Sequence, residues 1–234
     1  MKKIIFLALI SFPPLFFACS SDDEKEIPLS IEEEKLEIKI KNIDFIHANK
    51  FCNFKSKDEN IAIVSNAGTV TGISFGKTII TAYTDTESID CQISVIYNYN
   101  IYEEPILDFS VNKEHVKSNE KHELASEGYE MPGYNTNFDF PDSQVLCLYY
   151  NSTMENGYKF QYHYKFIDKI GSQLYSVQLS YPEELAGKIL LMLQERYGEY
   201  KLNGGYFIFN LSKQNFSVKL RSGNPRIIVY ERKI

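Results

Sequence analysis

Tyrosine is distributed unevenly along this chain, and the asymmetry divides the chain into two parts. Of the 17 tyrosines, only Tyr83 lies before residue 97, and all the others lie from Tyr97 onward. Because large aromatic side chains dominate the cores that contain them, an abrupt change of this kind is typical of two separate hydrophobic cores. We therefore predict one domain over residues 27–97 and a second over 103–234, with the boundary between them.

The first 18 residues have the pattern of a secretory signal peptide. Two lysines precede the apolar run 4–17, and the small residue Ala18 stands directly before Cys19. The run is shorter than the roughly 20 apolar residues that span a bilayer, so it predicts a cleaved export signal rather than a membrane helix.

The placement of Cys19 resembles that of a bacterial lipoprotein signal, in which this cysteine is lipidated and becomes the first residue. The resemblance implies an outer-membrane lipoprotein with palmitate among its acyl chains. Each methylene of these chains that is buried in the membrane contributes about 0.8 kcal/mol to membrane binding. The acidic tether over 19–26 resembles the export tag of surface-displayed lipoproteins of Bacteroidota and implies exposure at the cell surface. The alternatives are an incidental cysteine after an ordinary signal, and a solvated spacer on a periplasm-facing protein.

The charge balance argues against nucleic acid as a partner. After the signal peptide the chain carries 23 lysines and arginines against 31 acidic residues, and no basic run occurs. Binding to nucleic acid depends on lysine and arginine contacts to phosphate, so we expect no such partner.

The first domain shows the alternation of half-buried strands. Leu36, Ile38 and Ile40 alternate with charged residues, and turn signals separate the later runs. Several short strands at this spacing predict an all-β sandwich. The later runs cover residues 61–64, 69–71, 77–83 and 91–95.

The order of glycines and strands in this domain resembles the bacterial immunoglobulin-like domain of group 2, the type repeated in intimin- and invasin-like surface proteins. The resemblance is carried by residues 60–64, 68–73, 76–82 and 93–95, and it covers under a third of the chain. Phe54 stands where the family usually has tryptophan. The resemblance implies an Ig-like β-sandwich that serves as a rigid spacer or an adhesion module, without catalytic residues.

An apolar stripe at helical spacing predicts one long helix over 182–197 in the second domain. Ser180 and Glu183 have the spacing of a capping box, and the glycine after the stripe is suited to end the helix. A shorter helix is predicted over 113–119, opened by Asn112. The stripe consists of Leu185, Ile189, Leu193 and Tyr197.

Strand patterns surround these helices, so the second domain is predicted to be α+β, with an antiparallel or mixed sheet and the helices on one face. Aromatic residues alternate with Gln161, His163 and Lys165, which predicts one aromatic face and one solvent-exposed face. The domain resembles C-terminal modules of other Bacteroidota lipoproteins with an Ig-like domain, and no activity follows from that resemblance. The predicted strands are 145–150, 160–166, 174–179, 206–209, 216–220 and 227–230.

Cysteine pairing leaves two alternatives. Cys52 shares strand parity with Phe54, and Cys91 shares parity with Ile93, so both are expected to point inward. A Cys52–Cys91 disulfide is one outcome in an exported protein, and two buried free thiols are the other. Cys147 has no evident partner.

Motifs for chemistry are weak throughout. No H-E-x-x-H, C-x-x-C or G-x-S-x-G occurs, so we predict no catalytic residues, no metal site and no cofactor. The long loop 131–144 carries Tyr134, Phe138 and Phe140, which are either part of a core or an exposed ligand-binding edge.

These features favour a non-catalytic, lipid-anchored envelope protein whose Ig-like spacer presents a module that binds a protein or a glycan. Two alternatives remain: a polysaccharide hydrolase or hydrolase accessory at the cell surface, and a structural spacer in an envelope assembly. The sequence identifies no ligand.

Overall fold

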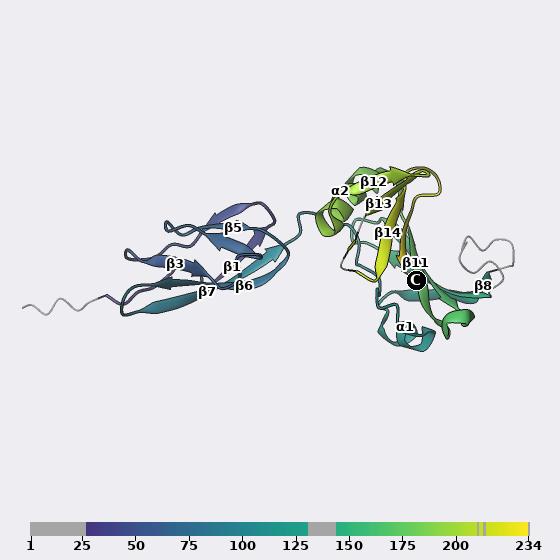
Figure 1. The fold of residues 1–234 in the computed structure, drawn as a ribbon, viewed down its shortest axis with the longest axis horizontal. Coiled ribbons are helices and arrows are strands. Elements are labelled where there is room, and N and C mark those ends of the chain that lie inside the picture. The colour runs from purple at the N-terminus through teal and green to yellow at the C-terminus, as the bar shows by residue number, and fades with distance from the viewer. Residues whose placement is uncertain (1–26, 131–143, 210, 213, 234) are drawn as a thin grey trace, which may run out of the picture.

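The computed structural model describes residues 27–130, 144–209, 211–212 and 214–233. They form two bodies that follow one another along the long axis of the molecule (Figure 1). The first body contains strands β1 to β7, and the second contains both α-helices and strands β8 to β15.

The first body is a sandwich of two sheets. The larger sheet has the strand order β1-β7-β6-β3, and the smaller has the order β2-β5-β4. β1 runs parallel to β7, and the other neighbours are antiparallel. The strands are β1 Lys35–Lys39, β2 Ile43–Phe45, β3 Asn53–Ser56, β4 Ala62–Val64, β5 Thr69–Gly72, β6 Gly76–Tyr83 and β7 Ser88–Ile96.

The core of the sandwich lies between its sheets, where the sequence alternation places it. Cys91, Ile93 and Val95 on β7 are buried, as their shared parity predicts. Ala62 and Val70 from the smaller sheet pack in the same hydrophobic cluster. Burial of alternate residues on two facing sheets confirms the predicted sandwich-like arrangement.

The second body is built on one eight-stranded sheet with the order β12-β13-β14-β15-β11-β10-β9-β8. All of its strand pairs are antiparallel, so the antiparallel alternative applies. The strands are β8 Glu123–Glu130, β9 Val145–Thr153, β10 Lys159–Ile167, β11 Gln173–Ser180, β12 Tyr200–Asn203, β13 Tyr206–Phe209, β14 Phe216–Arg221 and β15 Ile227–Arg232.

Two helices cover one face of this sheet. Helix α1 (Lys113–Asn119) buries Val116, and helix α2 (Ala186–Tyr197) buries Ile189 and Leu193 in the same cluster as the aromatic residues of β10. The side chain of Asn112 accepts a hydrogen bond from the His115 N–H at 3.0 Å, which confirms the predicted N-cap of α1. The predicted stripe of α2 therefore faces the core.

The predicted capping box of the long helix is wrong. Ser180 ends β11, and the 3₁₀ turn η2 (Glu183–Leu185) precedes α2, whose N-terminus has no side-chain cap. Glu183 instead forms an ion pair with Arg226 at 2.6 Å. Because the strand pairing holds Ser180 in extended backbone, this residue cannot reach the first turn of the helix.

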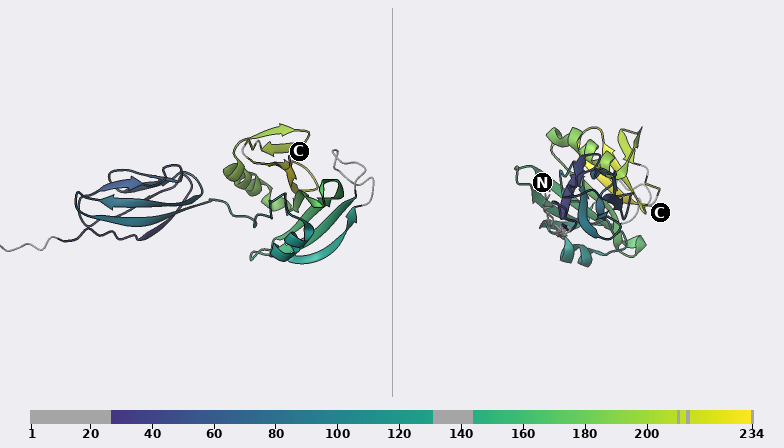
Figure 2. Two further views of the ribbon diagram at one scale, coloured as in Figure 1. Left: turned by 60° about the horizontal axis from the view of Figure 1, so that its bottom comes forward. Right: turned by 90° about the vertical axis from the view of Figure 1, so that its left-hand side faces the viewer.

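The chain enters and leaves the sandwich at opposite ends. The described part of the chain begins at one end of the first body, and helix α2 of the second body lies next to the other end (Figures 1 and 2). Among the described residues, no helix is long and apolar enough to cross a membrane.

Candidate functional site

Two sets of predicted site residues lie outside the described residues. The signal peptide, Cys19 and the acidic tether precede residue 27. The aromatic residues Tyr134, Phe138 and Phe140 fall in the undescribed stretch between β8 and β9. Lipidation and the loop-based ligand edge therefore stay predictions.

The Cys52–Cys91 disulfide is not formed. Both residues are buried free thiols, as is Cys147. Strand β6 lies between β3, which follows Cys52, and β7, which carries Cys91. Two strand spacings amount to about 9–10 Å, and a disulfide needs Cα atoms within about 7 Å. Both side chains point inward, as their strand parity predicts, but the strand order keeps the two thiols apart.

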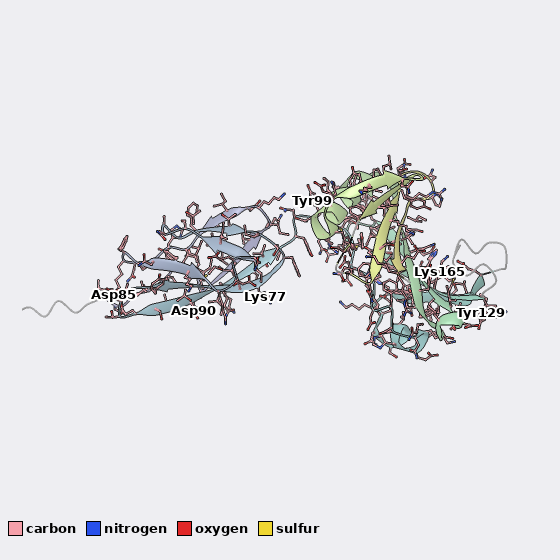
Figure 3. All side chains as sticks on the ribbon, viewed as in Figure 1. Lys77, Asp85, Asp90, Tyr99, Tyr129 and Lys165 are labelled. Atoms are coloured by element: carbon pink, nitrogen blue, oxygen red, sulfur yellow. The ribbon has the colours of Figure 1, made fainter. Side chains whose placement is uncertain are left out.

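The last turn of α2 binds the segment that connects the two bodies. The Glu195 carboxylate accepts hydrogen bonds from the backbone N–H groups of Asn98 and Tyr99, at 2.9 and 3.1 Å. It also accepts one from the Asn98 side-chain amide at 2.6 Å, and this amide donates to the Ile40 carbonyl of the sandwich at 3.0 Å. Tyr99 lies beside α2 between the two bodies (Figure 3). One carboxylate thus fixes the exit of the chain from the sandwich.

Arg196 extends this contact to Tyr97 at the end of the sandwich and to Glu104 of the connecting segment. Its guanidinium lies 3.0 Å from a Glu104 carboxylate oxygen and 4.8 Å from the centroid of the Tyr97 ring. The Tyr97 ring stacks on Phe75 of the sandwich, with 4.5 Å between ring centroids. Burial alone would lower the pKa of Arg196, but the Glu104 charge raises it above its usual value. An unbroken series of contacts therefore joins α2, the connecting segment and the sandwich.

A pair of buried tyrosines anchors the connecting segment in the core of the second body. The hydroxyl groups of Tyr102 and Tyr230 lie 2.5 Å apart, and neither side chain is more than 1% exposed. The Tyr197 hydroxyl donates to the Glu104 carboxylate next to Arg196. Burial raises the pKa of both Tyr102 and Tyr230 well above the ordinary value, so both stay neutral. We define the contacts made by residues 97–104 as the junction.

A second polar network holds the turn after α1. The buried Glu120 carboxylate accepts from the Tyr164 hydroxyl and lies 2.6 Å from His122 Nδ1. The His122 ring stacks on Tyr162 at a centroid distance of 4.4 Å. The Tyr164 hydroxyl in turn accepts from the Ile106 N–H at 3.1 Å. His122 is therefore a structural residue that fastens the turn after α1 to β10.

The predicted solvent-exposed face of β10 is exposed at Gln161, half-buried at His163 and buried at Lys165, which corrects the expectation for the last two residues. The Lys165 side chain is buried and pairs with Glu130 at 2.5 Å. Burial, and then the Lys165 charge, lower the pKa of His163 to about 4. On the adjacent strand, burial raises the pKa of the Cys147 thiol to about 12. Both groups are therefore neutral near pH 7, so Cys147 lacks the thiolate that a nucleophile requires.

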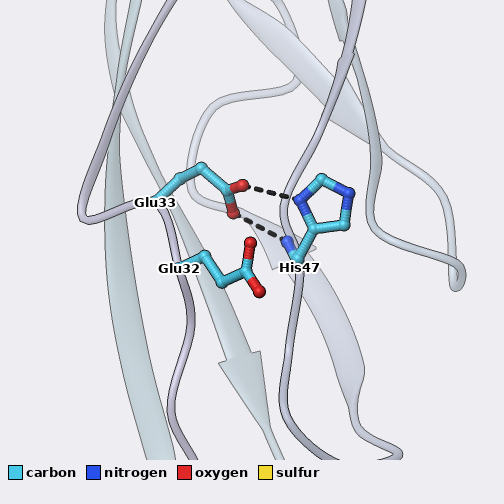
Figure 4. A group of neighbouring side chains, drawn as sticks. All are labelled: Glu32, Glu33 and His47. Carbon is cyan, nitrogen blue, oxygen red and sulfur yellow. Dashed lines mark hydrogen bonds and ion pairs between the residues drawn. The ribbon is translucent and has the colours of Figure 1, made fainter.

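Three side chains of the first body gather at its surface without any sequence motif. His47 Nδ1 lies 2.6 Å from Glu33 Oε1, and the His47 backbone N–H donates to Glu33 Oε2 at 2.7 Å (Figure 4). Glu32 joins them so that one potential ligand atom from each residue lies within 4.8 Å of the others. The backbone bridge between Ile31 and Ala48 brings these residues together, and no spacing rule predicts it.

Comparisons with known proteins assign no family. No family model matches the sequence, and no curated protein matches it significantly. Structures of domains 1–6 and of domains 5–6 of the surface layer protein SbsC share 12% and 13% identity, with TM-scores of 0.28 and 0.27. The alignments cover 66% and 89% of this chain, and 22% and 84% of those chains, so this chain spans about a fifth of the first. Similarity of this size shows neither a family nor a function.

Proposed function

We propose that this chain is a non-catalytic, lipid-anchored envelope protein whose sandwich is a spacer that presents the second body to a protein or glycan ligand. The junction is the observation that carries this proposal. Flexible linkers are rich in glycine and serine and make few contacts. Residues 97–104 instead contain the buried Tyr102, an ion pair to Arg196 and backbone bonds to Glu195.

The positions of the chain ends fit this role. Cys19 precedes the described residue Ile27 by eight positions, and the chain enters the sandwich at the end away from the second body (Figure 1). A lipid on Cys19 would therefore place the sandwich between the membrane and the second body. The bonds of the junction would then hold the second body in one orientation at the outer end.

We also propose that the sandwich is a bacterial immunoglobulin-like domain of group 2. Two glycines of the motif support this assignment because each meets a specific steric demand. Gly68 has a φ of +79°, and a Cβ there would lie 2.4 Å from the Ile46 carbonyl oxygen. A Cβ on Gly72 would lie 2.8 Å from the Lys39 carbonyl oxygen. Both positions therefore need glycine to let backbone segments approach closely.

Cell fractionation of the Cys19→Ala variant tests the anchor. We expect the wild-type chain in the outer-membrane fraction and the variant in the soluble fraction, because the acyl chains provide the membrane affinity. The matched control is Cys52→Ala, which removes a buried thiol and leaves the anchor intact. Unchanged membrane association of Cys19→Ala would contradict the proposal.

Protease treatment of intact cells tests the presentation of the second body. Loss of an epitope in the second body without outer-membrane permeabilisation is expected for a surface protein. Survival of the epitope until permeabilisation would reassign the protein to the periplasmic side. Capture of a defined protein or glycan by the full chain, but not by a chain truncated after residue 97, would assign binding to the second body.

A further inference from the structure

We propose that Glu32, Glu33 and His47 form a binding site for a divalent first-row transition-metal cation. The site lies on the sandwich, outside the junction, and it does not depend on the proposed anchor. It would join the segment that precedes β1 to the segment that follows β2.

The geometry brings three ligands of suitable chemistry to one point. Glu33 is already oriented, because one of its carboxylate oxygens accepts from the His47 backbone and the other lies 2.6 Å from the His47 ring. The Glu32 carboxylate is directed toward the same point (Figure 4). An imidazole nitrogen and two carboxylate oxygens within 4.8 Å of one another require only small side-chain movements to meet one cation.

The local electrostatics favour a bound cation. The charges of Glu32, Glu33 and Asp44 all act on the single imidazole of His47. Within the part of the chain that the structure describes, no lysine or arginine forms an ion pair with Glu32 or Glu33. Carboxylates held together without a cation repel each other, and a metal ion would relieve that repulsion.

The ligand set selects the class of metal. Calcium and magnesium prefer oxygen-only coordination, whereas imidazole suits zinc and its neighbours in the first transition row. Three protein ligands leave a fourth position of tetrahedral zinc for water or an exogenous group. The His47 side chain is 61% exposed and also lines an open hollow of about 540 Å³, so solvent can reach the site.

A cation at this point would act as a cross-link. The Glu32 N–H already donates to the His47 carbonyl at 3.0 Å, and Ile31 forms a bridge with Ala48. These bonds hold the segment through which the chain enters the sandwich. Metal binding to the folded form would stabilise this attachment, because the two segments lie together only after folding.

Calorimetric titration of the purified, detergent-solubilised full chain with zinc chloride tests the site. We expect one zinc site that His47→Ala weakens by at least about tenfold, since loss of even an outer-shell partner often costs that much. Glu32→Gln is a second test of the site, because glutamine has nearly the volume of glutamate. The structure describes no hydrogen bond or ion pair of the Glu32 side chain, so this change is not expected to affect folding. We expect weaker zinc binding by this variant too. The matched control is His115→Ala, which removes an exposed histidine of α1 and is expected to bind zinc as the wild type does.

Two results would overturn the proposal. The first is an absence of zinc binding by the wild-type chain. The second is binding by both His47→Ala and Glu32→Gln with the wild-type stoichiometry and affinity, which would place the zinc elsewhere. Circular dichroism of each variant confirms that it is folded before titration. Excess calcium or magnesium is expected to leave zinc bound, and displacement by calcium would contradict the predicted metal class.

Discussion

Replacement of Arg196 by methionine should loosen the junction without unfolding either body. The Arg196 side chain is 7% exposed, and methionine retains most of its apolar packing. The substitution removes the cation over the Tyr97 ring, the bond to Asn100 at 3.1 Å and the ion pair with Glu104. All three contacts hold residues of the connecting segment against α2.

The size of the effect follows from these contacts. A partly buried cation–π contact contributes about 1–2 kcal/mol, and the bond to Asn100 contributes about 1 kcal/mol. Because the Glu104 side chain is 37% exposed and keeps its bond from Tyr197, loss of the ion pair adds at most about 1 kcal/mol. The buried Arg196 Nε has no hydrogen-bond partner, and its removal offsets part of the cost. We expect a net loss of about 2 kcal/mol, or a roughly thirtyfold larger population of the open junction.

Amide hydrogen exchange measured by NMR reports this opening directly. The Asn98 and Tyr99 amides donate to Glu195 and should exchange about thirtyfold faster in Arg196→Met. Core amides of β7 and β10 should keep their wild-type rates, and small-angle X-ray scattering should show a broader range of molecular dimensions. Lys188→Met, which removes an exposed cation from the same helix, is the matched control. Unchanged exchange at Asn98 and Tyr99, or an equal change in the control, would refute the role of Arg196.

Three further predictions follow from the buried polar groups. Tyr102→Phe should lower the free energy of unfolding by about 1–2 kcal/mol, because it removes a partner of the buried Tyr230 hydroxyl. Urea unfolding followed by tyrosine fluorescence should show that the double variant Tyr102→Phe/Tyr230→Phe loses less stability than the sum of the two single variants. His163 binds a proton more weakly in the folded state, so the free energy of unfolding should fall as the pH drops from about 6.5 to about 4. His163→Gln should remove about 2–3 kcal/mol of that fall, and a variant whose stability falls with pH as the wild type's does would contradict the prediction. The three cysteines of the described residues should resist alkylation at pH 8 in the native chain and all react after denaturation without reductant, whereas a protected pair would indicate a disulfide.

Local patterns determined most individual elements of this fold. The apolar stripe of α2 and the alternation on β7 and β10 place the correct residues in the cores, because solvent-exposed and buried positions repeat with the period of each element. Asn112 caps α1 for a reason contained within four residues of chain. The lipid anchor and the Ig-like assignment remain predictions.

Both edge strands of the eight-stranded sheet, β8 and β12, escaped prediction. β8 and β12 carry mostly exposed residues, so their sequences lack the apolar alternation that marks a half-buried strand. Each strand exists because an adjacent strand, β9 or β13, offers free backbone groups to pair with. β8 pairs with a strand that begins only at Val145, so its local sequence does not record the pairing. The pairing of β12 is local, because Gly204 and Gly205, both with positive φ, form the two-residue turn to β13, and this hairpin signal was present in the sequence.

The positions and apolar faces of most half-buried strands and of both helices follow from the amino-acid sequence alone, since those properties depend on neighbours along the chain. Tertiary packing sets the strand order that separates Cys52 from Cys91 and the partial burial of His163. It also brings Glu32 and Glu33 to His47 and places Glu195 and Arg196 against residues 97–104. Each of these features involves residues that are distant in sequence. Their proximity depends on how whole elements pack rather than on any local spacing.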